Sequence, residues 1–370
     1  MPFKPKLLTK SRFTQALTCP TKLYYACDSD YANQSLDDPF LAALAEGGYQ
    51  VGELAKCYFP EGVEVTSLDT DEALSQTAAL MARETVTIFE PAITFNDCLV
   101  RVDVLVKRGD RIDIHEVKAK SFDSSQGTDF LKRDGTPKSD WKKYLYDVAF
   151  QKWVVQRAYP ASSVSAHLML SDISVRTRTS GLNQHFPIVT DANGRKRVQV
   201  AGILSSEDLD PPLLASVNVD AICADIFAAT DHGLAVEESF EEMVSRFSQS
   251  CRDHTLLDYR FGKQCKDCEY VALAPDLKAN KLDGRQGCFQ RKFGLDPAVL
   301  SEPTVLDLWS FPRKDQLIDA GIIRLSDVTE EDINVKPADD GLSRTERQWL
   351  QVEKAKNNDD SIWVDLEGLR

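Results

Sequence analysis

Long apolar runs are missing from this 370-residue sequence, and so are internal repeats and low-complexity segments. No stretch approaches the roughly 20 consecutive apolar residues that are needed to span a bilayer. The first six residues contain two lysines but no apolar segment of signal-peptide length and no small-residue cleavage site. We therefore expect a cytoplasmic protein that does not bind membranes. Its hydrophobic content, 42%, permits a large core, and its length permits two or three domains.

Positive charge is in deficit overall, because 44 Lys and Arg residues face 58 Asp and Glu residues and the net charge is −14. This balance counts against a general nucleic-acid coat protein, since phosphate binding needs local positive charge. The basic residues are nevertheless clustered, and each cluster is compatible with either a solvated surface or a binding patch. The first cluster precedes the first acidic residue, Asp28, and comprises Lys4, Lys6, Lys10, Arg12 and Lys22. The second cluster is interrupted by Asp134 and Asp140 and comprises Lys132, Arg133, Lys138, Lys142 and Lys143.

Strand and helix patterns both occur along the chain. Residues 99–107 and 111–118 alternate or are rich in β-branched residues, and the turn 108–110 between them predicts a β-hairpin. Asn193-Gly194 is typical of a tight turn and predicts a second hairpin over 186–200. The other predicted elements are a strand at 164–170 and helices at 36–58, 70–84, 141–158 and 237–248.

The first predicted hairpin carries Asp103 on one strand and Glu116 and Lys118 on the other. Residues two apart on a strand point to the same face, and the antiparallel turn brings Asp103 near Glu116. Two carboxylates bind hard cations such as Mg²⁺ or Mn²⁺ through oxygen. Such a cation lowers the pKa of a bound water and stabilises charge on a phosphate, while a lysine orients the water or stabilises the transition state. The pattern therefore predicts a centre for metal-dependent phosphodiester hydrolysis.

A solvent-facing hairpin with cross-strand charge pairs is the alternative interpretation of the same residues. The apolar neighbours weigh against it, because charges embedded in buried strands are costly unless they bind something. These neighbours are Val102, Val104, Ile112, Ile114 and Val117.

This arrangement resembles the PD-(D/E)XK nuclease superfamily, and specifically its RecB-like branch. In that branch a strand Asp and a Glu-x-Lys strand are followed by a helix that carries Gln and Tyr. Gln151 stands at the Gln position, whereas Val155 replaces the usual Tyr. The segment Gly48-Tyr-Gln-Val-Gly-Glu53 resembles an upstream helix of the branch that supplies a metal ligand. Glu53 is therefore a candidate ligand, and Glu46 is the second choice.

The resemblance implies an α/β fold with a restriction-endonuclease-like core, in which helices flank a mixed sheet. It implies a catalytic set and a Mg²⁺ or Mn²⁺ site that share two carboxylates. The catalytic residues would be Asp103, Glu116, Lys118 and Gln151, and the metal site would comprise Glu53, Asp103, Glu116 and Val117.

Nine cysteines occur in a sequence without a secretory signal, which favours metal binding over disulfides. Cys265 and Cys268 form a C-x₂-C pair, Cys288 follows, and Cys19 is a candidate fourth ligand. This one-plus-three pattern looks like the iron–sulfur nucleases of the RecB-like branch, which include the CRISPR spacer-acquisition nuclease family and AddB-type helicase–nuclease subunits. The resemblance implies a [4Fe–4S] cluster that closes the nuclease domain, with Zn²⁺ as the alternative.

The other cysteines have no matching partners and are expected to be small buried side chains, with Cys251 as the most plausible substitute ligand. They are Cys27, Cys57, Cys98, Cys223 and Cys251. The resemblance extends over about residues 7–290 and is closest to an uncharacterised bacterial family of such nucleases. It implies a nuclease core at 1–250, a cysteine region at 251–295 and a small helical segment at 296–370.

We therefore expect a metal-dependent nuclease, and more specifically an exonuclease, that hydrolyses DNA ends or single strands. Its setting would be defence, repair or recombination, with protein partners in a complex of that kind. A catalytically silent nucleic-acid-binding module on the same fold is the alternative. An iron–sulfur redox protein fits less well, because it has no use for two carboxylates and a lysine and the sequence has no nucleotide-binding glycine loop.

Overall fold

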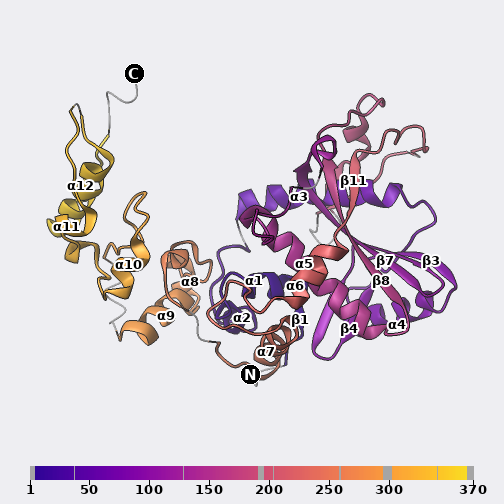
Figure 1. The fold of residues 1–370 in the computed structure, drawn as a ribbon, viewed down its shortest axis with the longest axis horizontal. Coiled ribbons are helices and arrows are strands. Elements are labelled where there is room, and N and C mark those ends of the chain that lie inside the picture. Colours follow the sequence, from indigo (N-terminus) through magenta and orange to yellow (C-terminus); the bar gives the residue numbers. More distant parts are fainter. Residues whose placement is uncertain are drawn as a thin grey trace. The chain divides into compact units, whose positions relative to one another are not determined.

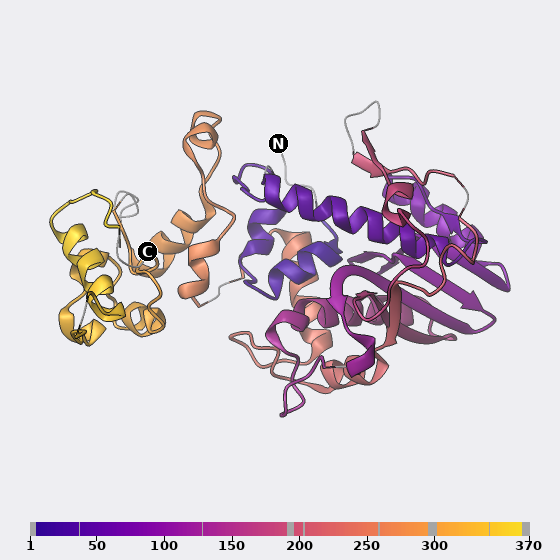
Figure 2. The ribbon, with the colours of Figure 1, turned by 90° about the horizontal axis from the view of Figure 1, so that it is seen from above.

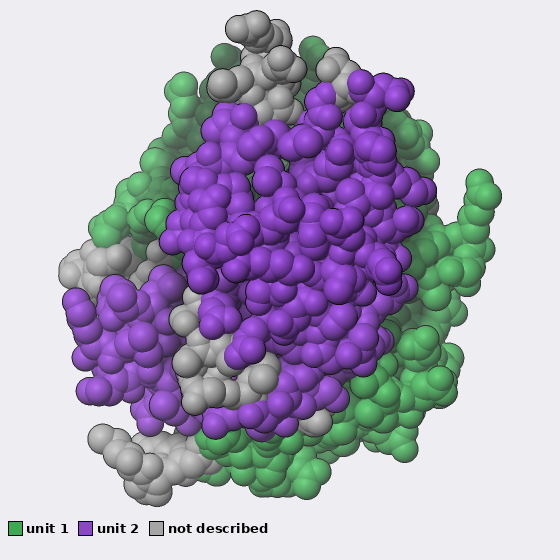
Figure 3. All heavy atoms as spheres, turned by 90° about the vertical axis from the view of Figure 1, so that its left-hand side faces the viewer, with its two compact units in different colours: residues 1–27, 37–258 green, residues 28–36, 259–370 purple. Residues whose placement is uncertain are grey.

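The computed structural model describes residues 5–36, 38–127, 129–190, 196–202, 204–257, 260–294, 302–339 and 341–364. The chain divides into two compact units, shown in different colours in Figure 3. Unit 1 comprises residues 1–27 and 37–258, and unit 2 comprises residues 28–36 and 259–370. The division at 258 falls inside the predicted cysteine region, so Cys251 belongs to unit 1 and Cys265 to unit 2.

Unit 1 is built on a six-stranded mixed sheet with the order β11-β8-β7-β6-β3-β2. The β7–β8 and β2–β3 pairs are parallel and the other pairs are antiparallel. The α/β fold class is therefore confirmed. The strands are β2 (Val63–Glu64), β3 (Thr85–Phe89), β6 (Val104–Arg108), β7 (Arg111–Phe122), β8 (Ser163–Asp172) and β11 (Leu214–Asn218).

The predicted helices of unit 1 are present with shifted ends. The N-terminal end of α3 is set by Asp38, whose carboxylate accepts the N–H groups of Phe40 and Leu41, and α7 begins with a capping box of Ser239 and Glu242. The helix bounds are α1 (Lys10–Ala16), α2 (Lys22–Ala26), α3 (Pro39–Cys57), α4 (Thr70–Met81), α5 (Ser139–Ala158), α6 (Asp220–Ala228) and α7 (Phe240–Asp253).

Helices α3 and α5 cover opposite faces of the six-stranded sheet (Figure 1 and Figure 2). Leu168 and Leu170 on β8 belong to the same buried cluster as Leu145 of α5. Met169, between them, belongs to a cluster with Leu54 of α3. Since successive strand residues point to opposite faces, β8 is buried on both sides. Within the described residues, no helix is both long and apolar enough to cross a membrane.

The prediction of one continuous strand over 99–107 is wrong. The chain breaks at Val102 and Asp103 into β5 (Cys98–Arg101) and β6, which belong to different sheets. Strand β5 pairs with β1 (Leu8–Thr9) and β4 (Ala92–Phe95) in a three-stranded sheet. The break has a local reason: the Asp103 carboxylate accepts the Val117 N–H over 2.7 Å, so a side chain replaces the next backbone bond of the β6–β7 ladder.

The predicted second hairpin is confirmed in its strands. Strand β9 (Ile188–Thr190) pairs antiparallel with β10 (Lys196–Val198). The turn residues Asn193 and Gly194 lie outside the described residues. The segment before β9 is attached to α3, because Gln50 Nε2 donates a hydrogen bond to the carbonyl oxygen of Phe186 over 2.8 Å.

Unit 2 has a hydrophobic core of its own, which includes Phe261, Phe289 and Leu308. Residues 28–36 belong to this unit because the Ala32 N–H donates to the Leu282 carbonyl over 2.9 Å. The described elements are η3 (Lys263–Asp267), α8 (Ala274–Lys278), α9 (Gly284–Phe293), α10 (Lys314–Asp319), η5 (Leu325–Asp327), α11 (Glu330–Ile333) and α12 (Arg344–Lys356).

Candidate active site

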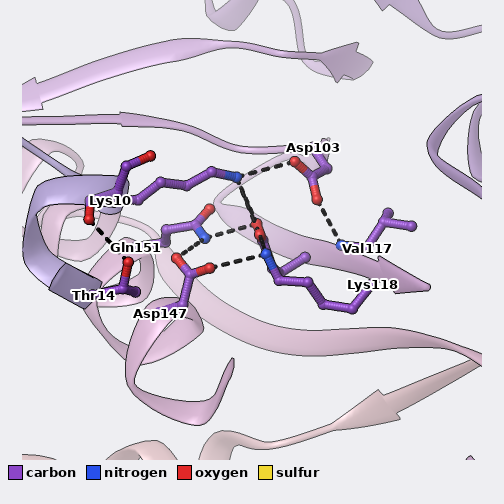
Figure 4. A network of polar contacts seen from close by, with 9 residues as sticks. Lys10, Thr14, Asp103, Val117, Lys118, Asp147 and Gln151 are labelled. Carbon is purple, nitrogen blue, oxygen red and sulfur yellow. Dashed lines mark hydrogen bonds and ion pairs between the residues drawn. The ribbon is translucent and has the colours of Figure 1, made fainter. Parts of the chain in front are cut away.

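Asp103 and Glu116 meet at the end of the β6–β7 ladder. The last paired residues are Val104 and His115, so Asp103 and Glu116 are the next opposing positions. Their carboxylates share one cation, the Lys10 ammonium, which lies 3.1 Å from Asp103 Oδ1 and 3.1 Å from each Glu116 oxygen. Figure 4 shows the Lys10 side chain reaching from α1 toward Asp103. The predicted proximity of the two carboxylates is confirmed.

Lys118 and Glu116 project from one face of β7, as predicted, because the Lys118 ammonium forms an ion pair with Glu116 Oε1. The same ammonium lies 3.0 Å from Asp147 Oδ2 on α5. Lys118 is therefore held between a carboxylate of the sheet and a carboxylate of the helix that covers it.

Gln151 is fully buried and contacts the site from behind. Its Nε2 donates to Glu116 Oε2 over 2.7 Å and to Asp147 Oδ1 over 3.0 Å. Its Oε1 is a buried acceptor that has no hydrogen-bond partner among the described residues. Gln151 thus fixes the orientation of Glu116, whereas the lining of the open cleft does not include it. Val155, at the position of the usual Tyr, is buried in the main core.

Burial and the neighbouring charges shift the pKa values of the two carboxylates in opposite directions. Burial and the Glu116 charge raise the pKa of Asp103 above its ordinary value. Burial also favours neutral Glu116, but the charges of Lys10 and Lys118 outweigh it and lower its pKa to about 2. Burial by itself lowers the pKa of Lys118, yet the carboxylates of Glu116 and Asp147 raise it overall. Glu116 and Lys118 are therefore both charged at neutral pH.

These groups open onto a cleft with a volume of about 480 Å³. Five basic side chains and four acidic ones line it, from α1, α3, the β3–β4 connection, the β6–β7 hairpin with the residue before it, and β10. The basic residues are Lys10, Lys56, Lys118, Lys196 and Arg197, and the acidic residues are Glu53, Glu90, Asp103 and Glu116. The cleft lining therefore carries one more basic than acidic side chain, in a chain whose net charge is −14.

The candidate ligand Glu53 lies in α3 and lines the cleft, as does Val117. Glu53 Oε1 is 2.7 Å from the Lys56 ammonium, which also pairs with Glu64. The second choice, Glu46, forms an ion pair with Lys196 of β10. Glu53 therefore lines the same cleft as Asp103 and Glu116, but its carboxylate pairs with the Lys56 ammonium and not with Lys10.

Three residues of this site were missed by sequence reasoning: Lys10, Glu90 and Asp147. Lys10 was noted only as part of a basic cluster, and its contacts span 93 and 106 residues of sequence. Glu90 has a left-handed backbone, with φ of 54°, and burial and the Asp103 charge raise its pKa to about 7. Asp147 could have been predicted from the sequence, because it precedes Gln151 by one helical turn and therefore lies on the same face of the helix.

The carboxylate pair fits a cation. Within the part of the chain that the structure describes, no group of three or more His, Cys, Asp or Glu side chains is arranged to hold a metal ion. Asp103 and Glu116 nevertheless direct three oxygens at one ammonium nitrogen. Carboxylate oxygens are also the donors that Mg²⁺ and Mn²⁺ prefer, so this donor set fits a hard divalent ion.

The predicted cluster cysteines come from both units. Cys19 lies in unit 1 in the turn between α1 and α2. The other three lie in unit 2. Cys265 is part of η3, Cys268 is the first residue after η3, and Cys288 is part of α9. All four are half-buried, and Cys265 and Cys288 both pack against the core of unit 2. Of the remaining cysteines, Cys27, Cys98, Cys223 and Cys251 are buried, as expected, and Cys57 is half-buried.

Comparison with known proteins gave no match to a family model, to a curated protein or to a solved structure.

Proposed function

We propose that unit 1 is a divalent-metal-dependent nuclease core of the PD-(D/E)XK superfamily, similar to its RecB-like branch. The observation that carries this proposal is the convergence of the Asp103 and Glu116 carboxylates on one cation, with Lys118 bonded to one of them. A solvated hairpin would not bury Glu116 to 1% exposure while surrounding it with two ammonium groups and an amide.

Asp103 and Glu116 would hold a Mg²⁺ or Mn²⁺ ion, with Glu53 and Val117 as the further candidates. When bound, such an ion lowers the pKa of water and stabilises charge on a phosphate. Lys118, oriented by Asp147, supplies a fixed positive charge for the phosphodiester. Gln151 keeps Glu116 in one orientation by a buried hydrogen bond.

The charge of the cleft supports a nucleic-acid substrate, for which we propose DNA ends or single strands. Five basic side chains, against four acidic ones, line the cleft of a chain whose net charge is −14. Phosphate binding depends on such local positive charge and not on the net charge of the protein. An exonuclease acting with partner proteins in defence, repair or recombination remains our proposal for its role.

A cleavage panel tests the proposed function. End-labelled single-stranded, blunt and tailed DNA, with single-stranded RNA beside them, would be incubated with Mg²⁺, Mn²⁺ or EDTA. We expect metal-dependent cleavage of DNA, with mononucleotide or short products from an end. Absence of cleavage on every substrate in Mn²⁺ would overturn the proposal.

A second candidate function is a catalytically silent nucleic-acid-binding module. It is favoured by one observation: the Lys10 ammonium forms ion pairs with both Asp103 and Glu116, and so occupies the oxygens that a metal ion would need. This candidate predicts that purified protein binds DNA equally well in EDTA and Mn²⁺ and cleaves none of the panel.

We also propose that Cys19, Cys265, Cys268 and Cys288 hold a [4Fe–4S] cluster, with Zn²⁺ as the alternative. Four half-buried thiols suit either group, because thiolates bind both iron–sulfur clusters and zinc. Cys265 and Cys288 already share the edge of one hydrophobic core.

A further inference from the structure

Lys10 is bound to the carboxylates through several contacts at once. Its ammonium lies 3.1 Å from Asp103 Oδ1, Glu116 Oε1 and Glu116 Oε2, and its side chain is 26% exposed. Glu116 has a second ammonium in Lys118. Asp103, in contrast, has Lys10 as its one ion-pair partner within the described residues, because its other oxygen accepts the Val117 N–H.

The backbone of Lys10 is fixed close to the site. Lys10 follows β1, and β1 pairs in parallel with β5, the strand that leads to Asp103. The Leu8 N–H donates to the Asp97 carbonyl over 2.8 Å, and Arg12 donates to the Leu7 carbonyl over 2.6 Å. Any displacement of the ammonium must therefore come from the long, unbranched side chain, while the backbone keeps its place.

The space between the carboxylates admits one cation. Mg²⁺ binds carboxylate oxygens at about 2.0–2.1 Å, inside the distance at which the same oxygens now hold the ammonium nitrogen. A divalent ion bound to Asp103 and Glu116 would therefore compete with Lys10 for the same oxygens and repel its charge. Lys10 also lines the cleft in which a phosphodiester would bind.

We propose that Lys10 is a built-in counter-ion of the carboxylate pair, which leaves Asp103 and Glu116 when a divalent ion binds and then neutralises a phosphate oxygen of the substrate. This inference rests on the proposed metal-dependent function and adds to it a residue with two positions. Lys10 offsets part of the negative charge of the carboxylate pair when no divalent ion is bound, and it makes metal binding weaker than the carboxylates alone would allow.

Metal affinity without DNA is the first test, so that catalysis plays no part. Mn²⁺ would be titrated by calorimetry into the full chain, into Lys10→Met and into Asp103→Ala. We expect Lys10→Met to bind Mn²⁺ about tenfold more tightly, because the competing cation is gone. The matched control is Lys152→Met, which removes a lysine that pairs with Asp220 over 2.6 Å outside the cleft and should leave the affinity unchanged.

The outcomes separate the two proposals. Mn²⁺ binding that is as tight in Asp103→Ala as in the parent protein would defeat the proposed function itself. Binding that depends on Asp103 but is unchanged or weaker in Lys10→Met would overturn the role of Lys10 alone, because a purely structural ion pair predicts that result.

The second test uses the unaltered chain and does not depend on a variant that folds. Lysine acetylation would be followed by mass spectrometry in EDTA and in saturating Mn²⁺. We expect the acetylation rate of Lys10 to rise several-fold in Mn²⁺ and to fall again when single-stranded DNA is added with Ca²⁺ in place of Mn²⁺. A Lys10 rate that stays the same in EDTA and Mn²⁺ would overturn the inference.

Discussion

Gln151 Nε2 donates a hydrogen bond to Glu116 Oε2 over 2.7 Å, and both residues are at most 1% exposed. This buried contact joins the helix α5 to the strand β7 at the centre of the site. It makes the amide of Gln151 a positioning group for a carboxylate whose other neighbours are ammonium groups.

The first prediction concerns this contact. Gln151→Ala should lower the rate of Mn²⁺-dependent cleavage by roughly 10–100-fold, because the supporting hydrogen bond of a metal-binding carboxylate is lost. Cleavage rate and Mn²⁺ affinity would be measured together. The control is Gln156→Ala in the same helix, whose amide bonds to Ser162 and Val164 outside the cleft. Equal rates for both variants would contradict the positioning role.

The second prediction concerns the carboxylate pair. Asp103→Ala or Glu116→Ala should reduce cleavage by at least about 10²-fold while the protein stays folded, because each carboxylate contributes to holding the metal ion. Circular dichroism would check the fold. Asp110→Ala is the matched control, since Asp110 lies exposed in the turn of the same hairpin. Full activity in either carboxylate variant would remove the basis of the assignment.

The third prediction separates the role of Lys118 from metal binding. Lys118→Ala should lower turnover more than Mn²⁺ affinity, because its ammonium acts on the phosphodiester. Asp147→Asn should have a smaller effect in the same direction, since Asp147 holds the Lys118 ammonium at 3.0 Å. Lys120→Ala, two residues along β7, is the control. An unchanged turnover with weakened metal dependence would contradict this role.

The fourth prediction concerns the cysteines. Anaerobically purified protein should be brown and contain iron and acid-labile sulfide in similar amounts. Serine at Cys19, Cys265, Cys268 or Cys288 should remove the colour and destabilise the protein, because assembly of such a site is coupled to folding. Cys57→Ser, which changes another half-buried cysteine, should keep both the brown colour and the stability of the parent protein. One bound zinc and no iron would replace the cluster by a four-cysteine zinc site, and metal content that survives Cys19→Ser would exclude Cys19.

The fifth prediction concerns pH and His115, whose ring stacks on that of His167 with 4.7 Å between the ring centroids. Burial and the His167 ring lower the pKa of His115 to about 4, from 6.5. Between pH 6.5 and pH 4, His115 is therefore protonated in the unfolded chain but neutral in the folded protein. The free energy of unfolding must then decrease as pH falls from 6.5 to 4. The loss attributable to His115 should be roughly 2 kcal/mol after allowance for its partial exposure.

His115→Gln tests this relation. Urea unfolding of the parent protein and the variant would be compared at pH 7 and pH 4.5. The variant should lose less stability than the parent over this interval, because it has no proton to take up at this position. Equal losses would show that His115 does not contribute to the pH dependence.

Local patterns were sufficient for much of the fold. The alternation over residues 111–118 placed Glu116 and Lys118 on one face, and their ion pair confirms it. Helical spacing located α5, and the strands of the second hairpin followed from their turn signal. The prediction of a continuous strand over 99–107 was wrong because the Asp103 side chain took the place of a backbone acceptor. Strand propensities do not encode such a replacement.

The sequence by itself determined the residues that are neighbours through strand or helix periodicity: Glu116 with Lys118, and Asp147 with Gln151. Only the tertiary structure decided which distant charges meet them. Lys10 reaches Asp103 because β1 pairs with β5, and β10 brings Lys196 and Arg197 to the cleft. The physical reason is that periodicity fixes the direction of a side chain within one element, whereas contacts between elements depend on how buried faces pack, and a lysine's long side chain has no period that reveals its partner.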